Sequence, residues 1–421
     1  MKTIIIFLLI FSIIVAFHEF GHFYFAKKAG IRVREFALGM GPKLFAKQDK
    51  DGTTYTIRML PLGGYVRLAG LNEEDGIEPG MNLGLGFSSE GKVNAINLSK
   101  KEIADQLPIQ VDQVDLVDAM TIQGIPIGQD QVVTYYVDDN ALIREADGTQ
   151  VLVSPRSTRY ESASPWNKIK TNIAGPLNNF ILSILIFSII ALVSGGVASN
   201  RAQIGELVDQ SPAMTAGLKA GDLVLQVGDQ SVNNWSEMVA VIQANPGQTM
   251  DFQVQRGQDQ VVVPVAIASV TDQESQGSYG QIGITRYYDT RISARLLYGF
   301  SQTWQVIAMV ISTILGMFTR GFDVNQFGGP VAMAQMTSEV VGFGWLAILS
   351  YMAMISANLG IMNLLPIPAL DGGKIILNLY ELVRGKPLAQ EKEGIITLVG
   401  VGFLVILMIV VTWNDIMRAF F

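Results

Sequence analysis

The sequence predicts an α-helical membrane protein that crosses the bilayer about four times, with a β element after the first span and an inserted soluble α+β domain. The composition is the first reason: it is 49% hydrophobic and 16% charged, with a mean hydropathy of +0.33, which is too apolar for an ordinary soluble protein. The second reason is a set of apolar runs long enough to cross a bilayer, at 3–26, 173–193, 343–363 and 394–413. The third is a stretch of soluble character, 202–270, between the second and third runs.

The first apolar run contains the pentapeptide His18-Glu19-Phe20-Gly21-His22 near its end. In a helix, two histidines four residues apart project from one face, and the HExxH spacing is typical of a zinc site. The carboxylate of Glu19 beside them can accept a proton from the attacking water and return it to the leaving amine. Ionisable groups inside a membrane helix are costly and therefore indicate function. The motif predicts a zinc peptidase in which His18 and His22 are metal ligands and Glu19 is the base.

Composition narrows the choice of a third ligand. The chain has two histidines, both in the pentapeptide, and no cysteine. A catalytic zinc site usually has three protein ligands and one open position, so the third ligand must be an aspartate or a glutamate. The lack of cysteine also excludes disulfides and thiolate chemistry. The net charge of −7, without a basic block that contains aromatic residues, argues against nucleic acid as a partner.

Basic residues directly after the first span place that end, and the site with it, toward the cytoplasm by the positive-inside rule: Lys27, Lys28, Arg32 and Arg34. Residues 35–70 then alternate like strands, with a turn at 50–52 and an interruption at 61–64. Two interpretations stay open. The segment is a small cytoplasmic sheet, or its edge lies beside the active site and holds the substrate in extended form, because a helical peptide bond is shielded from attack.

The region 71–160 is the least informative. Residues 132–137 alternate and 147–148 suggest a hairpin. Residues 84–87, Gly-Leu-Gly-Phe, imitate a peptide-binding loop, but no suitable domain pattern follows, so we interpret them as a coincidence.

The second span, 166–196, begins with Lys168 and Lys170 and therefore runs outward. It contains Gly175-Pro176 and the pair Asn178-Asn179. Amides are costly in lipid, and both a helix-packing role and a substrate-contacting role remain open for this pair.

The segment 292–320 is apolar but interrupted by polar residues, and it fits an interfacial helix within an extracytoplasmic connector, 271–342. If it lies in the interface, the span 343–363 runs inward and Asp371 arrives on the same side as the histidines. Two prolines before Asp371 and two glycines after it allow the backbone to turn there and aim the side chain at a metal. Asp371 is therefore the candidate third ligand. The other candidate carboxylates lack this arrangement of two prolines before the residue and two glycines after it. They are Glu339, Asp323 and Glu381.

With HEFGH in a first membrane helix and Asn363 to Gly373 reading NxxPxPxLDG, the chain resembles the site-2 protease family of intramembrane zinc metalloproteases. Residues 211–229, with Gly-Leu-Lys-Ala-Gly-Asp at 217–222, resemble a PDZ domain, as in the bacterial branch with a single PDZ domain. The stretch 35–70 is similar to the membrane-associated β element of that branch. The implied organisation is 1–26, first helix; 27–165, cytoplasmic loop; 166–196, second helix; 202–270, extracytoplasmic PDZ-like domain; 271–342, connector; and 343–421, last two helices.

The resemblance implies Zn2+ held by His18, His22 and Asp371, a base at Glu19, and substrate positioning by Asn363 and Asn179. It also implies partners: single-pass membrane segments left after a first cut, such as anti-sigma factors and signal-peptide remnants, in the bilayer of the cell membrane. Two rival functions remain at this point. One is a membrane-anchored zinc peptidase that acts on soluble or extracytoplasmic peptides, and the other is a scaffold whose PDZ-like domain recruits partners.

Overall fold

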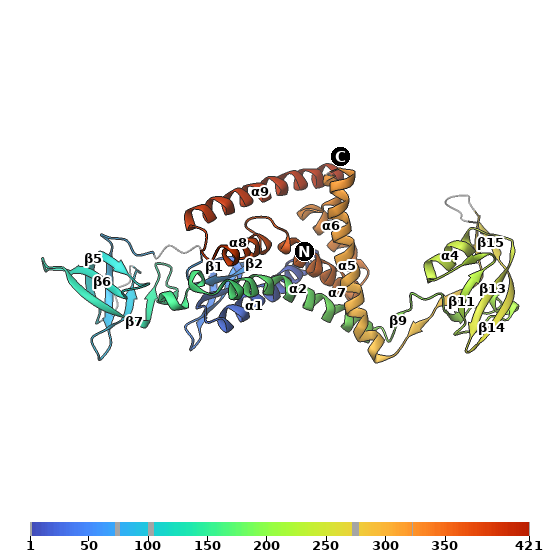
Figure 1. The fold of residues 1–421 in the computed structure, drawn as a ribbon, viewed down its shortest axis with the longest axis horizontal. Helices are drawn as coiled ribbons and strands as arrows, with labels where there is room; N and C mark the ends of the chain where they lie inside the picture. Colours follow the sequence, from blue (N-terminus) through green and yellow to red (C-terminus); the bar gives the residue numbers. More distant parts are fainter. Residues whose placement is uncertain (1, 72–75, 100–104, 272–277, 322, 421) are drawn as a thin grey trace. The chain divides into compact units, whose positions relative to one another are not determined.

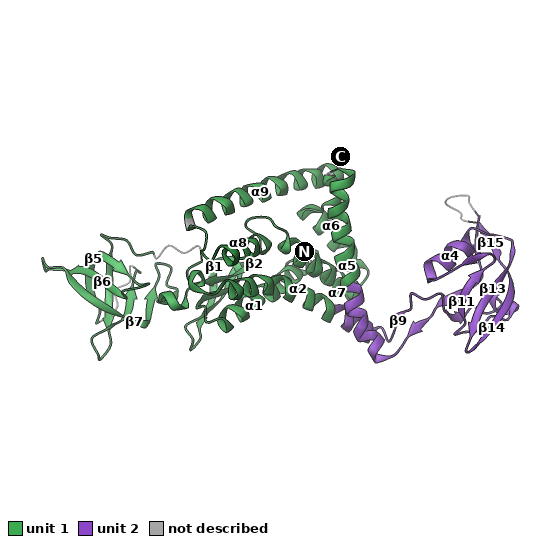
Figure 2. Ribbon diagram, in the orientation of Figure 1, with its two compact units in different colours: residues 1–185, 303–421 green, residues 186–302 purple. Residues whose placement is uncertain are grey.

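The structure is a computed structural model that describes residues 2–71, 76–99, 105–271, 278–321 and 323–420. The chain forms two compact units, residues 1–185 with 303–421 and residues 186–302 (Figure 2). The first unit contains most of the helices and two β elements, and the second is a β-rich domain.

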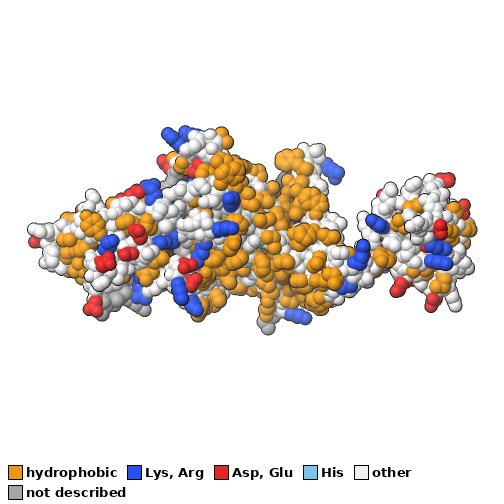
Figure 3. All heavy atoms as spheres, turned by 60° about the horizontal axis from the view of Figure 1, so that its bottom comes forward, with side chains coloured by type: hydrophobic (Ala, Val, Ile, Leu, Met, Phe, Trp, Pro, Cys, Tyr) orange, Lys and Arg blue, Asp and Glu red, His pale blue; other side chains and the backbone are white. Residues whose placement is uncertain are grey.

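Several described helices are long and apolar enough to cross a membrane, as expected of a polytopic membrane protein. Large apolar side chains on these helices are exposed, and Figure 3 shows apolar side chains covering much of the helical surface. Such a surface is stable in contact with acyl chains rather than water. The five candidate spans are α1 (Lys2–Lys28), α2 (Pro165–Val193), α5 (Ile292–Arg320), α7 (Trp345–Leu364) and α9 (Gln390–Phe420) (Figure 1). The shorter helices of the first unit are α6 (Pro330–Gly342) and α8 (Asp371–Arg384), with 3-10 turns at Arg156–Thr158, Tyr160–Ser162 and Val324–Gln326.

Helices α1 and α2 pack closely because small residues lie between them. A Cβ atom at Gly21 would lie 2.2 Å from the carbonyl oxygen of Ala174, and small residues of this kind let membrane helices approach. The amide of Asn178 donates a hydrogen bond of 2.8 Å to the carbonyl oxygen of Phe17. Asn178 therefore has the helix-packing role, and the approach of the two helices fixes the surroundings of the HExxH turn.

The segment after α1 forms a hairpin of β1 (Val33–Gln48) and β2 (Thr54–Leu68). The expected interruption at 61–64 is wrong, because β2 continues through it and bends at Gly63, whose φ is 77°. As a result both halves of β2 pair with β1; Phe36, for example, is a partner of both Tyr55 and Val66. Among the described strands only β1 pairs with residues 64–68, so this segment is a sheet edge.

The region that the sequence left open forms a second sheet with its own core. Its strand order is β4-β3-β5-β6-β7-β8, and an additional pairing of β4 with β7 closes the sheet on itself. The Gly-Leu-Gly-Phe run lies inside a strand, where Gly84 pairs with Asn97 on one side and with Pro108 on the other. Its backbone is already paired, so it is not a peptide-binding loop. The strands are β3 (Asn82–Phe87), β4 (Val93–Asn97), β5 (Leu107–Asp115), β6 (Thr121–Pro126), β7 (Val133–Arg144) and β8 (Gln150–Leu152).

The second unit is an α+β domain with one hydrophobic core, which includes Met238, Phe252 and Ile282. The expected end of this domain at residue 270 is too early, because Ile282 is 2% exposed and the strand after it pairs with the first strand of the core. The elements are β9 (Val197–Ala198), β10 (Ile204–Leu207), α3 (Pro212–Ala216), β11 (Leu223–Val227), β12 (Gln230–Ser231), α4 (Trp235–Gln243), β13 (Thr249–Arg256), β14 (Asp259–Ala266), β15 (Ala268–Thr271), β16 (Ser278–Gln281), β17 (Ile284–Arg286) and β18 (Tyr288–Asp289).

The Gly-Leu-Lys-Ala-Gly-Asp run of this unit is a structural turn. Gly217 ends α3 with φ of 89°, a conformation that favours glycine. Asp222, 1% exposed, accepts hydrogen bonds from the backbone N–H of Lys219 at 2.9 Å and from the guanidinium of Arg256 at 2.7 Å. The signature residues therefore hold the loop against the sheet.

Candidate active site

The HExxH pentapeptide lies in α1, and the helix places both imidazoles on one face. The Nε2 atoms of His18 and His22 are 3.2 Å apart. Glu19 is half-buried next to them. The structure therefore reproduces the predicted placement of both imidazoles on one face of a helix, with Glu19 beside them.

Asp371 reaches the histidines from the other end of the chain. Helix α7 ends at Leu364, and the prolines at 366 and 368 prevent a continuous helix. Asp371 is the first residue of α8, and its Oδ2 atom lies 3.2 Å from Nε2 of His18 and 3.3 Å from Nε2 of His22. In the part of the chain that the structure describes, these three residues are the one group of His, Asp or Glu side chains placed to hold a metal ion.

The glycines after Asp371 have a different role from the one expected. The turn is made at Ala369, whose φ is 81°, whereas Gly372 and Gly373 belong to the first turn of α8. A Cβ atom would lie 2.2 Å from the carbonyl oxygen of Leu365 at position 372 and 2.5 Å from that of Ile367 at position 373. The glycines thus let the start of α8 pack directly on the preceding loop, which fixes where Asp371 points.

The dimensions of the triad fit zinc. Bonds of about 2.0 to 2.1 Å to a tetrahedral zinc ion place two ligand atoms about 3.3 to 3.4 Å apart. The three separations between ligand atoms are 3.2, 3.2 and 3.3 Å. The side chains of His18, His22 and Asp371 are 10%, 12% and 11% exposed, so one face of the triangle remains open to a cavity.

A second layer of contacts fixes the imidazole rings. Nδ1–H of His22 donates to the carbonyl oxygen of Thr171 at 2.8 Å, which leaves Nε2 free to bind metal. The amide of Asn179 lies 3.2 Å from Nδ1 of His18. Asn179 is fully buried, and this contact supports the ring of His18 from the side of α2. The part in substrate positioning expected for Asn179 stays a prediction.

Gly175 is a site residue whose role sequence reasoning missed. A Cβ atom at this position would lie 2.3 Å from Nε2 of His22 and 2.8 Å from Cε1 of His18. The sequence shows a Gly-Pro pair at 175–176 in the second apolar run. That pair alone does not indicate that Gly175 faces the two imidazoles. Only a residue without a side chain allows α2 to lie against both imidazoles.

A cavity of about 270 Å³ opens onto the triad and Glu19. The edge segment of β2 forms one wall through Tyr65, Val66 and Leu68. Asn363 also lines the cavity. The remaining described lining residues are Leu71, Asn172, Ala369, Leu370 and Lys374.

The rival carboxylates lie elsewhere. Glu381 accepts two hydrogen bonds of 2.9 Å from the ammonium of Lys168. Asp323 accepts from the backbone N–H of Asn325 at 3.0 Å, and Glu339 is exposed on α6. None of them joins the metal-binding group.

A buried polar cluster connects the two halves of β2 next to the cavity. Glu35, 2% exposed, accepts hydrogen bonds from Thr56 at 2.6 Å, Arg58 at 2.7 Å and Tyr65 at 2.9 Å. Burial alone would raise the pKa of Glu35, but these hydrogen bonds outweigh it and lower the pKa. Burial and the adjacent carboxylate raise the pKa of Tyr65 to about 12.

We expect Tyr65→Phe to lower the thermal unfolding midpoint by a few degrees at neutral pH, because a hydrogen bond to a charged group contributes about 1.5 to 3 kcal/mol. The folded pKa of Tyr65 lies above its unfolded value near 10. Its contribution is therefore complete below pH 10 and is lost as the pH rises through about 12. The midpoint difference between wild type and Tyr65→Phe should shrink over that interval. If this midpoint difference stays constant as the pH rises from 10 to about 12, the result would contradict a stabilising hydrogen bond from Tyr65 to Glu35.

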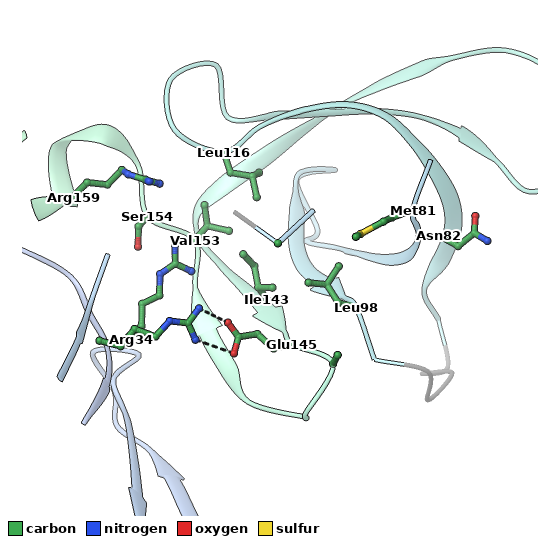
Figure 4. A pocket seen from close by; sticks show the side chains of 13 residues that line it. Arg34, Met81, Asn82, Leu98, Leu116, Ile143, Glu145, Val153, Ser154 and Arg159 are labelled. Atoms are coloured by element: carbon green, nitrogen blue, oxygen red, sulfur yellow. Dashed lines mark hydrogen bonds and ion pairs between the residues drawn. The ribbon is translucent and has the colours of Figure 1, made fainter. Parts of the chain in front are cut away.

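A separate cavity of about 410 Å³ lies between the hairpin and the inserted sheet (Figure 4). Arg34, Arg67 and Arg159 line it together with Glu145, and Arg67 forms two hydrogen bonds, of 3.0 and 2.6 Å, with that carboxylate. Its described lining contains no histidine and one carboxylate, so it offers no metal-binding group.

The fold and the site define a class: a zinc metallopeptidase with several helices long and apolar enough to cross a membrane, and with two histidines and one aspartate placed to hold a metal ion. The sequence profile of peptidase family M50 matches residues 6–407, and the chain belongs to this family, the site-2 proteases. It is 46% identical over 427 residues to "Probable protease eep" of Enterococcus faecalis, covering 100% of each chain.

A protein named "Putative zinc metalloprotease" from Lactococcus lactis is 42% identical over 434 residues, covering 100% of this chain and 99% of that protein. Among solved structures, the PDZ domain of the SdrC-like protein from Listeria monocytogenes is 21% identical, covers 21% of this chain and 90% of that one, and has a TM-score of 0.18.

Proposed function

We propose that this zinc metalloprotease hydrolyses peptide bonds within or near the transmembrane segments of single-pass membrane proteins that a first cut has already shortened. Anti-sigma factors and signal-peptide remnants are substrates of this type, and the reaction would serve regulated intramembrane proteolysis. One observation carries the proposal: the metal-binding group of His18, His22 and Asp371 is buried among helices whose outer surfaces are apolar.

In this proposal His18, His22 and Asp371 hold the zinc ion. When bound, zinc supplies Lewis acidity toward the scissile carbonyl and the attacking water. Glu19 accepts the proton of that water and passes it to the leaving nitrogen. Asn363, on the cavity wall, donates a hydrogen bond from its amide to the peptide backbone and orients it.

The substrate would bind as an extended strand along residues 64–68. This segment is a sheet edge and lines the catalytic cavity, and strand addition to such an edge satisfies the backbone of an unwound peptide. The polar cluster around Glu35 holds the edge in place. A transmembrane helix must therefore unwind locally before it is cut.

This step predicts that helix stability limits cleavage. The test peptide is a fluorophore–quencher transmembrane peptide with three glycines next to the scissile bond. Replacing them with alanine should slow cleavage by up to about 100-fold, because each Gly→Ala change stabilises a helix by about 1 kcal/mol.

The same three changes at the far end of the peptide serve as the control and should have little effect. Equal cleavage rates for the glycine peptide, the peptide with alanines beside the scissile bond and the peptide with alanines at the far end would contradict the proposal that the substrate helix unwinds before cleavage. Faster cleavage of a soluble peptide than of any of them would favour the anchored peptidase.

We further propose four spans, α1, α2, α7 and α9, in the cell membrane, with the active site toward the cytoplasm and the PDZ-like domain outside. Basic residues follow α1 and start α2, which supports a cytoplasmic position for those ends. The apolar side chains of α5 concentrate on one side far more than those of α1 or α7, which supports an interfacial helix. With α5 in the interface, α7 runs inward and delivers Asp371 to the side of the histidines.

Cysteine labelling tests this topology, because the chain has no cysteine of its own. We expect Lys50→Cys and Lys386→Cys to react with a membrane-impermeant maleimide from the cytoplasmic side, and Gln258→Cys from the outer side. Labelling of Lys386→Cys from the outside would show that α5 crosses the membrane.

A further inference from the structure

A lysine in the catalytic cavity has no role in the scheme above. Lys374 lies on α8 one helical turn after Asp371, so the two side chains lie on neighbouring parts of one helix face. It lines the same cavity as His18 and Glu19. Among the described residues that line this cavity, it is the one lysine or arginine.

The ammonium group of Lys374 is not used as a structural cation. Within the described part of the chain it forms no hydrogen bond or ion pair, although its charge acts on the carboxylates of Glu19 and Glu393. Lys168 provides the contrast, since both oxygens of Glu381 accept hydrogen bonds from it at 2.9 Å. Lys374 is half-buried, and its flexible stem allows the charged end to move within the cavity.

Peptide hydrolysis beside the triad would develop negative charge in the cavity that Lys374 lines. The water oxygen bonds to the carbonyl carbon, its proton moves to Glu19, and the electron pair of the C=O bond moves onto the carbonyl oxygen. The C–N bond then breaks as that pair re-forms the C=O bond, and the nitrogen takes the proton from Glu19 and leaves as an amine. The oxyanion exists only between these two steps, so a group that binds it lowers the barrier without tightening substrate binding.

We propose that Lys374 is a further catalytic residue whose ammonium group donates a hydrogen bond to this oxyanion. The inference rests on the proposed function, because it needs a peptide carbonyl beside the triad. A cation in a small, partly dehydrated cavity stabilises an oxyanion far more than a neutral carbonyl. The alternative role is local charge balance for Glu19 and Glu393, and the two roles predict different kinetics.

The test compares Lys374→Met, Lys374→Arg and Arg384→Met with wild type, all full-length, on the transmembrane peptide. Arg384 is an exposed cation on the same helix and outside the cavity, so it controls for the loss of one charge. We expect Lys374→Met to lower kcat about 100- to 1000-fold, as removal of an oxyanion donor does, with KM within about threefold of wild type and zinc content unchanged. Lys374→Arg should recover part of the loss, and Arg384→Met should match wild type.

A second readout does not depend on turnover. A phosphinic peptide carries a tetrahedral anionic group in place of the scissile bond, so its affinity should fall in Lys374→Met by a factor similar to the fall in kcat.

Unchanged kcat in Lys374→Met, or loss of its zinc, overturns the inference. The inference is also overturned if Lys374→Met shifts the acid limb of the pH–rate profile but has a normal kcat at its pH optimum. That result would assign Lys374 the role of charge balance for Glu19 and Glu393. If wild type is no faster than Glu19→Gln although both contain zinc, the proposed function itself fails and the inference fails with it.

Discussion

Asp371→Asn is expected to lose zinc and activity together, whereas Glu19→Gln should keep zinc and lose activity. The amide removes the one anionic ligand of a three-ligand group whose ligand atoms lie 3.2 to 3.3 Å apart. Glu19 lies beside that group, and glutamine cannot accept the proton of the attacking water. We expect cleavage to fall at least 1000-fold in both variants, while zinc per protein falls only in Asp371→Asn.

Metal analysis of the purified proteins and cleavage of one transmembrane peptide check both halves of this expectation. His18→Ala serves as a second ligand variant and should behave like Asp371→Asn. A Glu19→Gln protein with near-normal turnover would show that another group takes the proton. An Asp371→Asn protein that retains full zinc would exclude Asp371 as a ligand.

Gly175→Ala is expected to disrupt the site although it changes neither a ligand nor the base. The added methyl carbon would lie 2.3 Å from Nε2 of His22, well inside van der Waals contact, so α2 or the imidazole must move. Displacing a ligand by this amount should weaken zinc binding about 10- to 100-fold, as losses of supporting contacts do. Competition with a graded zinc chelator measures that change, and cleavage should fall at least as much.

Gly402→Ala is the matched control, because a Cβ atom there meets no described atom within 4 Å and the residue lies in the apolar helix α9. It should leave zinc affinity and cleavage unchanged. If Gly175→Ala also had no effect, the close approach of α2 to the imidazoles would not be needed for metal binding.

The helical spans and the candidate metal site could be predicted from the sequence, because a bilayer allows few backbone structures and a metal ion accepts few types of ligand. Long apolar runs have few stable forms in a bilayer, and HExxH on a helix places two imidazoles together through the helical repeat alone. With two histidines and no cysteine in the chain, the predicted third ligand had to be a carboxylate, and the prolines before Asp371 pointed to the one that the structure places beside both histidines. These conclusions depend on local geometry and composition, which a sequence states directly.

The tertiary structure decided what depends on contacts between distant segments. The contact of Asn179 with His18, the closeness of Gly175 to both rings and the packing of Gly372 on the preceding loop all depend on how helices approach one another. The edge of β2 reached the cavity because the strand bends at Gly63 and pairs twice with β1. A glycine or an asparagine in a sequence does not state what faces it, because that partner lies up to hundreds of residues away and only the folded chain brings the two together.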